Sequence, residues 1–530
     1  MKSPRLLPLL LALVKFVSGY LLASPAYELH RDEYLYLNYG QHVAWGYIEL
    51  PPLTALQSWL TLALGGGYFW VKFWPLLWGS LTVYSICRAA QRLGGGTWAV
   101  VLTALCYLLG GFSRLNFLFQ PNSFEVFAFT LTCYWLIRYQ QEPKSRFLYG
   151  VGAVLGLALL NKYSTLFFVA ALVGSLLLIP ARRVLATRAF WLGAGLALLL
   201  WLPNLLWQLR HGIPFLHHMQ ELHDTQLVNV NLADFWKDQL LMCVPALWVW
   251  VLGLLALLFY APFRAYRAVG LVYVFGLLIL TLLRGKSYYA LGYYPILFAA
   301  GAVWWEQRLA HWPSAGRWLR PALLALPVLL VLPLYPYIIP FLSPARLQKL
   351  GVAYQGTGVL RWEDGQDHPL PQDFADMLGW QELADKTWQA YQQLPDSTRA
   401  RTLIKCDNYG QAGAINYFNR RRAMPAATSF NGSYLYWFPL KPAQPYQHLL
   451  LIGEGNPQEL VPYFREFRKV GEITNPYARE RGTTIYLGTT PTSALLARVY
   501  REHQEELAQW EGRYSLSNRS SSSGKIITSP

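Results

Sequence analysis

Four charged side chains stand close together in the stretch RDEYLYLNYGQHVAWGYIELPPL, residues 31–53, directly after an apolar segment. Arg31, Asp32 and Glu33 are consecutive, and Glu49 precedes a P-P pair. A carboxylate within hydrogen-bond reach of a hydroxyl can accept its proton and so activate it as a nucleophile. Charged groups within or beside a bilayer are costly and tend to be functional. The stretch is therefore a candidate site, with a solvated loop between two apolar segments as the alternative.

Two later segments combine cations with tyrosines. LNKYS contains Lys162 at the turn between two closely linked apolar segments, and RGKSYYALGYYP contains Lys286 at the end of another. Paired cations at that depth suit a lipid-linked phosphate. The alternative is an aromatic belt at the membrane interface with snorkelling cations. RGKSYYALGYYP is not a nucleotide-binding P-loop, because Leu280 stands where that motif requires its first glycine.

Histidines, carboxylates and Arg210 gather in PNLLWQLRHGIPFLHHMQELHD. His217 and His218 are adjacent and lack the i, i+4 spacing that would place two metal ligands on one helix face. The five cysteines show no ligand spacing either, so we expect no structural zinc site. A divalent metal ion held by the histidine segment remains the alternative.

The elements that carry these residues must lie in a membrane, because 54% of the 530 residues are hydrophobic and only 14% are charged. Apolar runs long enough to cross a bilayer recur along the first 342 residues. The first follows Lys2 and Arg5 and is expected to be a retained anchor, since no small-residue cleavage site precedes the polar run. We therefore predict an all-α polytopic membrane bundle of about eleven transmembrane helices, at residues 6–23, 68–88, 97–113, 122–138, 147–161, 163–180, 189–207, 241–260, 268–283, 291–307 and 321–342.

Charge distribution predicts the orientation. Most basic residues before residue 342 fall in alternate loops, which the positive-inside rule assigns to the cytoplasm. Of eleven acidic residues in the same region, only Glu142 and Glu306 fall on that side. The candidate carboxylates and the part after residue 342 are thus expected outside. Topology, helped by anionic lipid heads, explains the net charge of +16, and we expect no nucleic acid partner.

The chain divides into three expected regions: a membrane domain at 1–342, a small α/β domain at 343–490, and a helical extension with a disordered tail at 491–530. In the second region RTLIKCDN, HLLLIGEG and RGTTIYLG predict strands, and QAGAINYF and PQELVPYFREF predict helices. Loops 24–67 and 208–240 mix apolar, aromatic and charged residues. They are predicted to form interfacial amphipathic helices that roof a cavity.

The motifs match a known family in order along the chain. DEYLYLNYGQHVAWGYIELPPL resembles the first outer loop of bacterial relatives of protein O-mannosyltransferases and of lipid A aminoarabinose transferase. FQPNSFE, LNKYS, PNLLWQLRHGIPF and GKSYYALGYYP resemble later blocks, and FADMLGWQELA and NYGQAGAINYF resemble segments of bacterial members. The resemblance covers residues 5–440. It implies the GT-C glycosyltransferase fold, with the α/β domain outside a bacterial inner membrane.

The resemblance also implies a reaction. Such enzymes pass a sugar from a polyprenyl-phosphate donor to an acceptor on the outer, periplasmic face, usually with inversion at the anomeric carbon. The implied general base lies in the pair Asp32 and Glu33, with Asp32 favoured. Cations and tyrosine hydroxyls must hold the departing phosphate. The candidates for substrate binding are Lys162, Arg210, Lys286, Tyr288, Tyr289 and Tyr293.

Two departures from the family pattern change the assignments. Many relatives have P-D where this chain has Pro121 and Asn122, so the second carboxylate role passes to Glu125, one helical turn on, and Asn122 is assigned to sugar binding. A buried structural glutamate is the alternative for Glu125. Glu49 stands at the family's acid before P-P and is assigned to substrate organisation, with metal binding as an option that the following Leu50 weakens.

The expected partners are a polyprenyl-phosphate-sugar donor, membrane lipids, and a lipid, glycan or protein acceptor. No cofactor is required by this reading, and a divalent metal ion remains an option at Glu49. Two other classes of protein compete with the glycosyltransferase. One is a secondary transporter, which would usually place its charges at the midplane on broken helices. The other is a non-catalytic protein that binds a polyprenyl lipid.

Overall fold

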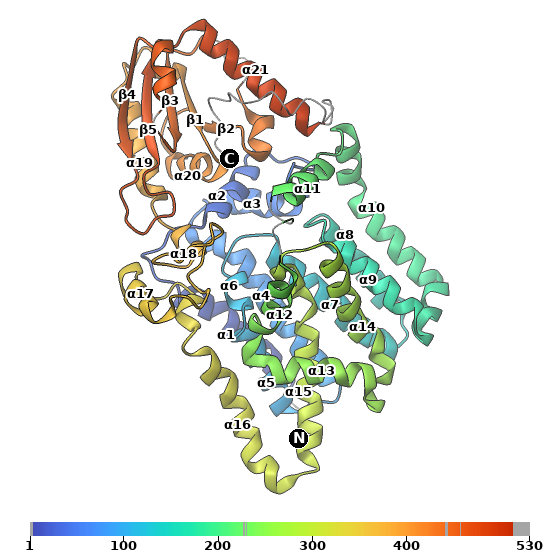
Figure 1. Cartoon of the computed structure of the whole chain (residues 1–530). Coiled ribbons are helices and arrows are strands. Elements are labelled where there is room, and N and C mark those ends of the chain that lie inside the picture. Colours follow the sequence, from blue (N-terminus) through green and yellow to red (C-terminus); the bar gives the residue numbers. More distant parts are fainter. Residues whose placement is uncertain (1–3, 226–227, 229–230, 440–443, 456, 512–530) are drawn as a thin grey trace.

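A computed structural model of the chain describes residues 4–225, 228, 231–439, 444–455 and 457–511. Helices dominate the first 342 residues, and a small mixed sheet follows (Figure 1). The bundle helices are α1 (Leu7–Leu21), α2 (Arg31–Tyr39), α3 (Leu53–Ala63), α4 (Tyr68–Arg92), α5 (Thr97–Leu108), α6 (Phe112–Leu115), α7 (Asn122–Gln141), α8 (Ser145–Leu159), α9 (Thr165–Leu177), α10 (Arg188–Arg210), α11 (Pro214–Thr225), α12 (Leu232–Leu241), α13 (Leu247–Phe259), α14 (Arg267–Leu282), α15 (Pro295–Ala310) and α16 (Pro313–Val331).

Each of the eleven predicted apolar segments contains a helix: α1, α4, α5, α7, α8, α9, α10, α13, α14, α15 and α16. The number of transmembrane spans is not confirmed. By length and composition, three helices among the described residues qualify, 188–210, 261–282 and 313–331, or four with the pair 232–241 and 244–259, which bends by 58°. Several others, such as the 12 residues of α5, are shorter than the roughly 17 residues that a straight span needs.

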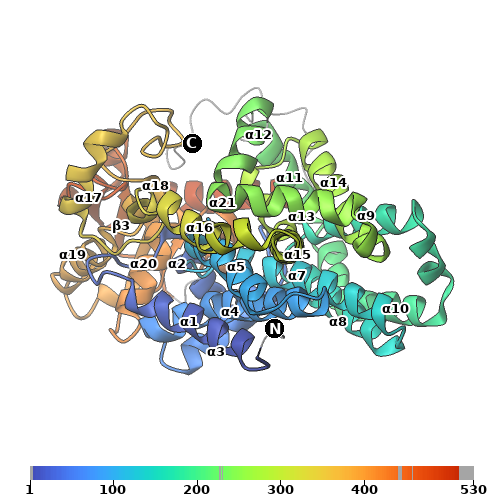
Figure 2. The same ribbon diagram turned by 90° about the horizontal axis from the view of Figure 1, so that it is seen from below.

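The helices predicted for the two long loops are present, as α2 and α3 in the first loop and α11 and α12 in the second. Small residues let the longer helices pack closely, as expected for helices in lipid. A Cβ at Gly152 of α8 would lie 2.0 Å from the carbonyl oxygen of Gly193 in α10, and one at Gly301 of α15 would meet α13. In Figure 2, which views the molecule from below, α4, α5, α15 and α16 lie near the middle of the molecule.

The C-terminal part is built on a five-stranded sheet of order β2-β1-β3-β5-β4, in which β1 pairs with β2 and β3 in parallel and the other pairs are antiparallel. Short 3₁₀ segments include η5 (Ser287–Tyr293), η9 (Gly432–Trp437) and η10 (Gln458–Tyr463). The strands and helices here are β1 (Thr402–Cys406), β2 (Ala427–Ser429), β3 (His448–Gly453), β4 (Glu466–Glu472), β5 (Thr484–Thr489), α17 (Pro344–Gly351), α18 (Gln372–Ala375), α19 (Trp380–Gln392), α20 (Tyr409–Asn419) and α21 (Ser493–Trp510).

The three predicted strands are confirmed as β1, β3 and β5, and QAGAINYF is the helix α20. The helix predicted for PQELVPYFREF is wrong in its second half. Pro462 lies inside the short 3₁₀ segment η10, and the chain then continues as the edge strand β4 against β5. The helical extension is α21, whereas the tail at 512–530 lies outside the described residues. The domain boundaries at 342 and 490 stay predictions.

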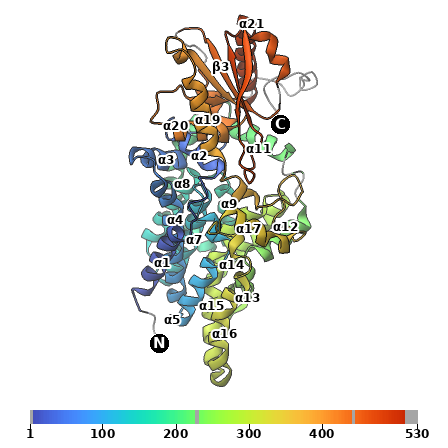
Figure 3. The same ribbon diagram turned by 90° about the vertical axis from the view of Figure 1, so that its left-hand side faces the viewer.

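The sheet is joined to the bundle through α2 and α20, which lie side by side (Figure 3). Gly413 of α20 touches the backbone of Tyr34 in α2, so closely that a Cβ there would lie 2.8 Å from the Tyr34 Cβ. The backbone N–H of Glu28, just before α2, donates to the carbonyl of Met377, and the Glu28 carboxylate accepts the backbone N–H groups of Trp380 and Gln381 at the start of α19. The C-terminal part therefore contacts both α2 and the segment just before it.

The close contact between α2 and α20 predicts the effect of Gly413→Val. The added side chain must displace the Tyr34 backbone, at a cost of about 1–3 kcal/mol. Thermal unfolding in detergent should show a lowered midpoint, and limited proteolysis should cut faster within residues 343–490. Gly195→Val in α10 is the matched control, since a Cβ at Gly195 meets no atom within 4 Å. Equal effects of both substitutions would contradict the close-packing explanation.

Candidate active site

The two adjacent carboxylates in the first turn of α2, Asp32 and Glu33, differ in their exposure to solvent. His30 caps the helix: its Nδ1 accepts the backbone N–H of Asp32 at 3.2 Å, and its own backbone N–H donates to the Glu33 carboxylate at 2.7 Å. Negative charge is favourable in this first turn because the unpaired N–H groups of a helix start carry partial positive charge. Asp32 is partly exposed, whereas Glu33 is fully buried.

Glu33 forms a buried ion pair with Lys72 of α4. Both carboxylate oxygens lie 2.7 Å from the Lys72 Nζ, and the backbone N–H of Phe119 donates to the same carboxylate at 2.7 Å. The side chains of Glu33 and Lys72 are 0% and 1% exposed, so neither reaches solvent. With its oxygens saturated by these donors, Glu33 binds α2 to the bundle.

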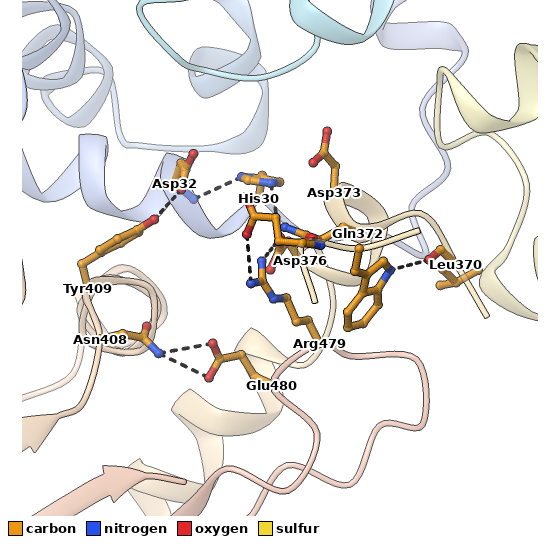
Figure 4. Close-up of polar contacts among 12 residues, drawn as sticks. His30, Asp32, Leu370, Gln372, Asp373, Asp376, Asn408, Tyr409, Arg479 and Glu480 are labelled. Carbon is orange, nitrogen blue, oxygen red and sulfur yellow. Dashed lines mark hydrogen bonds and ion pairs between the residues drawn. The ribbon is translucent and has the colours of Figure 1, made fainter. Parts of the chain in front are cut away.

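Asp32 receives one hydrogen bond from the bundle and one from the C-terminal part. The Gln120 side-chain amide donates to Oδ2 at 3.0 Å, and the Tyr409 hydroxyl donates to Oδ1 at 2.8 Å. Figure 4 shows Tyr409 pointing from α20 toward Asp32. Burial, and next the charge of Asp32, raises the pKa of Tyr409 well above its usual value, so the phenol keeps its proton. A carboxylate has about four lone-pair sites, which leaves acceptor capacity on Asp32.

Arg31 also contacts the Tyr409 ring. Its guanidinium carbon lies 4.8 Å from the centre of the Tyr409 ring, within the range of a cation–π interaction. The Arg31 backbone N–H donates to the carbonyl of Asp376, whose carboxylate pairs with Arg479 at 3.0 Å (Figure 4). Burial raises the pKa of Asp376. The family-like segment FADMLGWQELA thus contacts the start of α2.

A chain of side-chain contacts leads from Asp32 to the second predicted carboxylate. The Gln120 side chain accepts from Asn122 at 2.9 Å, and the Asn122 carbonyl oxygen accepts from Lys162 at 2.8 Å. Lys162 also lies 3.1 Å from Glu125, which is further bound by the Ser164 hydroxyl. Three predicted residues, Asn122, Glu125 and Lys162, are therefore in direct contact.

Tyrosines cover Lys162 on the side of η5. The Lys162 Nζ lies 4.5 Å from the ring centre of Tyr289 and 5.7 Å from that of Tyr288. These predicted residues thus join the same cluster. Tyr293 is 4% exposed and packs its ring 5.5 Å from Phe129, so its ring belongs to the apolar core below.

A cavity of about 300 Å³ opens beside Asp32, between α2, α11 and the C-terminal part. It is lined by acidic and aromatic side chains and by His218, whose pKa is lowered by burial. Glu49 lies at its wall and is tied to η9: its carboxylate accepts from the Tyr39 hydroxyl at 2.6 Å and from the Ser433 backbone N–H at 2.8 Å. The side chains at the cavity include Asp32, Tyr36, Glu49, His218, Glu221, Tyr409 and Trp510.

Two predicted cations stand apart from the cluster around Lys162. Arg210 is the last residue of α10 and is exposed. Lys286 precedes η5 and is not among the residues that line the cavity. Within the part of the chain that the structure describes, no group of three or more histidine, cysteine, aspartate or glutamate side chains is arranged to hold a metal ion.

Four residues at the site escaped the sequence analysis: Lys72, Gln120, Ser164 and Tyr409. Ser164 and Gln120 lie within or beside the motifs LNKYS and FQPNSFE, so their proximity to predicted residues was a usable signal. Lys72 also carried a signal, since a lysine inside an apolar span requires a partner. Tyr409 lies within the family-like segment NYGQAGAINYF, but 377 residues separate it from Asp32, so nothing in the sequence indicated that the two residues meet.

Comparison with known protein families gives a match over residues 49–207 to the model for dolichyl-phosphate-mannose-protein mannosyltransferase. Among curated proteins, the chain is 27% identical over 205 residues to the lipid A galacturonosyltransferase RgtD of Rhizobium johnstonii. That match spans 38% of this chain and 43% of RgtD, which is less than half of the relative's length.

Among solved structures, ArnT from Cupriavidus metallidurans bound to undecaprenyl phosphate aligns with a TM-score of 0.56 at 15% identity, covering 90% of this chain and 97% of ArnT. The apo state of the same ArnT gives a TM-score of 0.54 at the same identity and coverage. The chain therefore has the GT-C fold of ArnT. The sequence matches are to glycosyltransferases, the class of enzyme that the motifs predicted.

The buried ion pair predicts a large effect of a single neutralisation. Lys72→Met leaves the Glu33 charge buried without its partner, which should cost about 3–5 kcal/mol. The double variant Glu33→Gln/Lys72→Met removes both charges and should recover part of the loss. Thermal unfolding of the purified proteins in detergent measures both. A double variant no more stable than Lys72→Met would contradict the role of the unpaired charge.

Proposed function

We propose that this protein transfers a sugar from a polyprenyl-phosphate-linked donor to a hydroxyl group of a lipid, glycan or protein acceptor. The observation that carries the proposal is the continuous chain of contacts from Asp32 through Gln120 and Asn122 to Lys162, beside a cavity and within a GT-C fold. It brings a proton acceptor and a cation for a leaving phosphate into one site. The printed name of RgtD makes lipid A one acceptor to test.

Asp32 is the general base in this proposal. The acceptor hydroxyl donates its proton to a free lone pair of the Asp32 carboxylate as its oxygen attacks the anomeric carbon. The bond from that carbon to the phosphate oxygen breaks, and the electron pair leaves with the phosphate. Attack from the face opposite the phosphate inverts the anomeric configuration. Gln120 and Tyr409 hold the carboxylate in place through the two hydrogen bonds described above.

Lys162 is assigned to the departing phosphate, with the hydroxyls of Tyr288 and Tyr289 beside it. Preorganised positive charge stabilises the negative charge that develops on the leaving group. Glu125 and Asn122 fix the ammonium group of Lys162 at 3.1 and 2.8 Å. Asn122 is also the candidate for sugar binding. Lys286 is the second candidate cation.

Glu33 and Glu49 receive positioning roles. Burial and the pairing of Glu33 with Lys72 favour Asp32 as the base within the adjacent pair. Glu49 connects the cavity wall to η9 by accepting the Ser433 backbone N–H. Its proposed part in substrate organisation is therefore to hold the shape of the cavity. Arg210 and Tyr293 retain their substrate-binding assignment only as predictions, since one is exposed at the end of α10 and the other is packed in the core.

The proposed setting is a bacterial inner membrane, with Asp32 and the C-terminal part on the periplasmic side. The charge distribution along the sequence supports this orientation, because basic residues gather in the alternate loops on the other side. A protein that binds a polyprenyl lipid without chemistry would share the fold. Such a protein would have no transfer activity for the loss of a carboxylate to abolish, which separates the two functions.

Asp32→Asn tests the proposed base. The amide keeps the shape and the hydrogen bond from Tyr409 but accepts no proton, so transfer should fall about 10²- to 10⁴-fold. A strain that lacks the chain is complemented with either protein, and its membrane glycolipids and surface glycans are compared by mass spectrometry. The wild-type protein should restore a missing sugar and the variant should not.

The matched control is Asp385→Asn, which removes a partly exposed carboxylate of α19 remote from the cavity. It should restore the sugar fully. Full restoration by Asp32→Asn would exclude this aspartate as the base, and an unchanged glycan profile in the deletion strain would argue for the lipid-binding alternative.

Lys162→Met tests the proposed phosphate site. Loss of the ammonium group should lower transfer by about 10²- to 10³-fold, since one preorganised donor to the developing charge is removed. Binding of undecaprenyl phosphate to the purified protein, measured by native mass spectrometry, should weaken in parallel. Unaltered lipid binding and transfer by this variant would place the phosphate elsewhere. Lys237→Met, on α12, serves as the control for loss of one positive charge on the same predicted side.

A further inference from the structure

A second cavity, of about 800 Å³, lies among the ends of α4, α15 and α16. The loop of three glycines between α4 and α5 forms part of its wall, and the segment before α1 contributes another part. Its polar lining consists of four arginines, two glutamines and one glutamate: Arg5, Arg88, Gln91, Arg92, Glu306, Gln307 and Arg320.

This cavity is remote from Asp32. Lys72, which binds the α2 carboxylate, and Arg92 lie on the same helix and are 20 residues apart, so about 30 Å of helix separates them at a rise of 1.5 Å per residue. That length equals the thickness of the hydrocarbon core of a bilayer. Figures 1 and 3 show α16 at the end of the bundle opposite to the sheet. The cavity and the candidate active site thus lie at opposite ends of the bundle.

The positive charge of the cavity is poorly compensated. Its one carboxylate, Glu306, is already bound at the start of α5, where it accepts the backbone N–H groups of Gly96 and Ala99 at 2.5 and 3.4 Å. Arg88 donates to the uncharged side chain of Gln91 at 2.7 Å.

The remaining arginines differ in their pairing. Arg92 lies 3.3 Å from Glu142, outside the cavity lining. Within the described ranges, Arg5, Arg88 and Arg320 form no ion pair with a carboxylate. The Arg320 Nε is buried and finds no hydrogen-bond acceptor among the described residues. Guanidinium groups are therefore gathered in a concavity without the anion that would balance them.

We propose that this cavity binds a phosphate-bearing anion, supplied by the headgroup of an anionic membrane lipid. Guanidinium groups match phosphate oxygens in geometry and charge, and basic pockets between membrane helices bind anionic headgroups. The position at the end of the bundle brings the cavity to the level of lipid headgroups. This site is independent of the sugar-transfer proposal, because it involves none of the residues assigned there.

Arg88→Gln/Arg320→Gln removes two of the unpaired guanidinium groups. The matched control Arg146→Gln/Arg317→Gln removes two exposed arginines that do not line the cavity and that the sequence assigns to the same membrane side. Phosphatidylglycerol and phosphatidylcholine are titrated separately onto the full chain in detergent, and bound lipid is counted by native mass spectrometry. Inorganic phosphate is added in a third arm, with thermal unfolding as the readout.

The wild-type and control proteins should prefer phosphatidylglycerol to phosphatidylcholine, and the cavity variant should bind phosphatidylglycerol about tenfold more weakly. Arg88→Lys/Arg320→Lys keeps the positive charge and should lose less phosphatidylglycerol binding. It provides the test if the glutamine variant does not fold. A different result is that inorganic phosphate stabilises the wild-type protein and not the cavity variant, while phosphatidylglycerol is bound no better than phosphatidylcholine. That result would support the anion site but assign it to a soluble phosphate. Equal phosphatidylglycerol binding by wild type and cavity variant, or an equal loss in the control, would overturn the proposal.

Discussion

The buried ion pair between Glu33 and Lys72 is the interaction on which the candidate site depends. A helix of nine residues such as α2 is not stable alone, so its position is set by what it contacts. Glu33 fixes it to α4, and Gly413 fixes its other side to α20. Asp32, the neighbour of Glu33, is thereby held at the cavity with its carboxylate partly exposed. Glu33 thus positions the helix, and Asp32, the proposed base, stays accessible from the cavity.

The two ends of the proposed reaction are coupled through uncharged amides. Gln120 and Asn122 stand between Asp32 and Lys162, and each amide donates in one direction and accepts in the other. This arrangement keeps Asp32 apart from Lys162. A direct ion pair between them would occupy the carboxylate lone pairs that must accept the proton of the acceptor hydroxyl. The C-terminal part contacts the proposed base through the Tyr409 hydroxyl, which donates to the Asp32 carboxylate.

Sequence reasoning located the elements better than their partners. Long apolar runs predicted helices in all eleven segments where the structure has one. Asn122, Glu125 and Lys162, which the motifs proposed for the site, are in direct contact, although their roles stay predictions. The predicted number of spans stays unconfirmed, because several helices, such as α5, are shorter than the apolar runs that predicted them. Arg210 was assigned to the site by its motif, but it is exposed at the end of α10, where the local sequence does not determine the direction of its side chain. Contacts such as Tyr409 with Asp32 depend on tertiary packing that no local pattern encodes.

The most direct test of the central claim is an electron cryomicroscopy structure of the protein with undecaprenyl phosphate in a lipid nanodisc. The account predicts that the phosphate lies within about 3 Å of the Lys162 ammonium group, with the Asp32 carboxylate facing the same space. The hydrogen bonds from Gln120 and Tyr409 to Asp32 should persist. A phosphate bound away from Lys162, with Asp32 closed off from it by protein, would contradict the account.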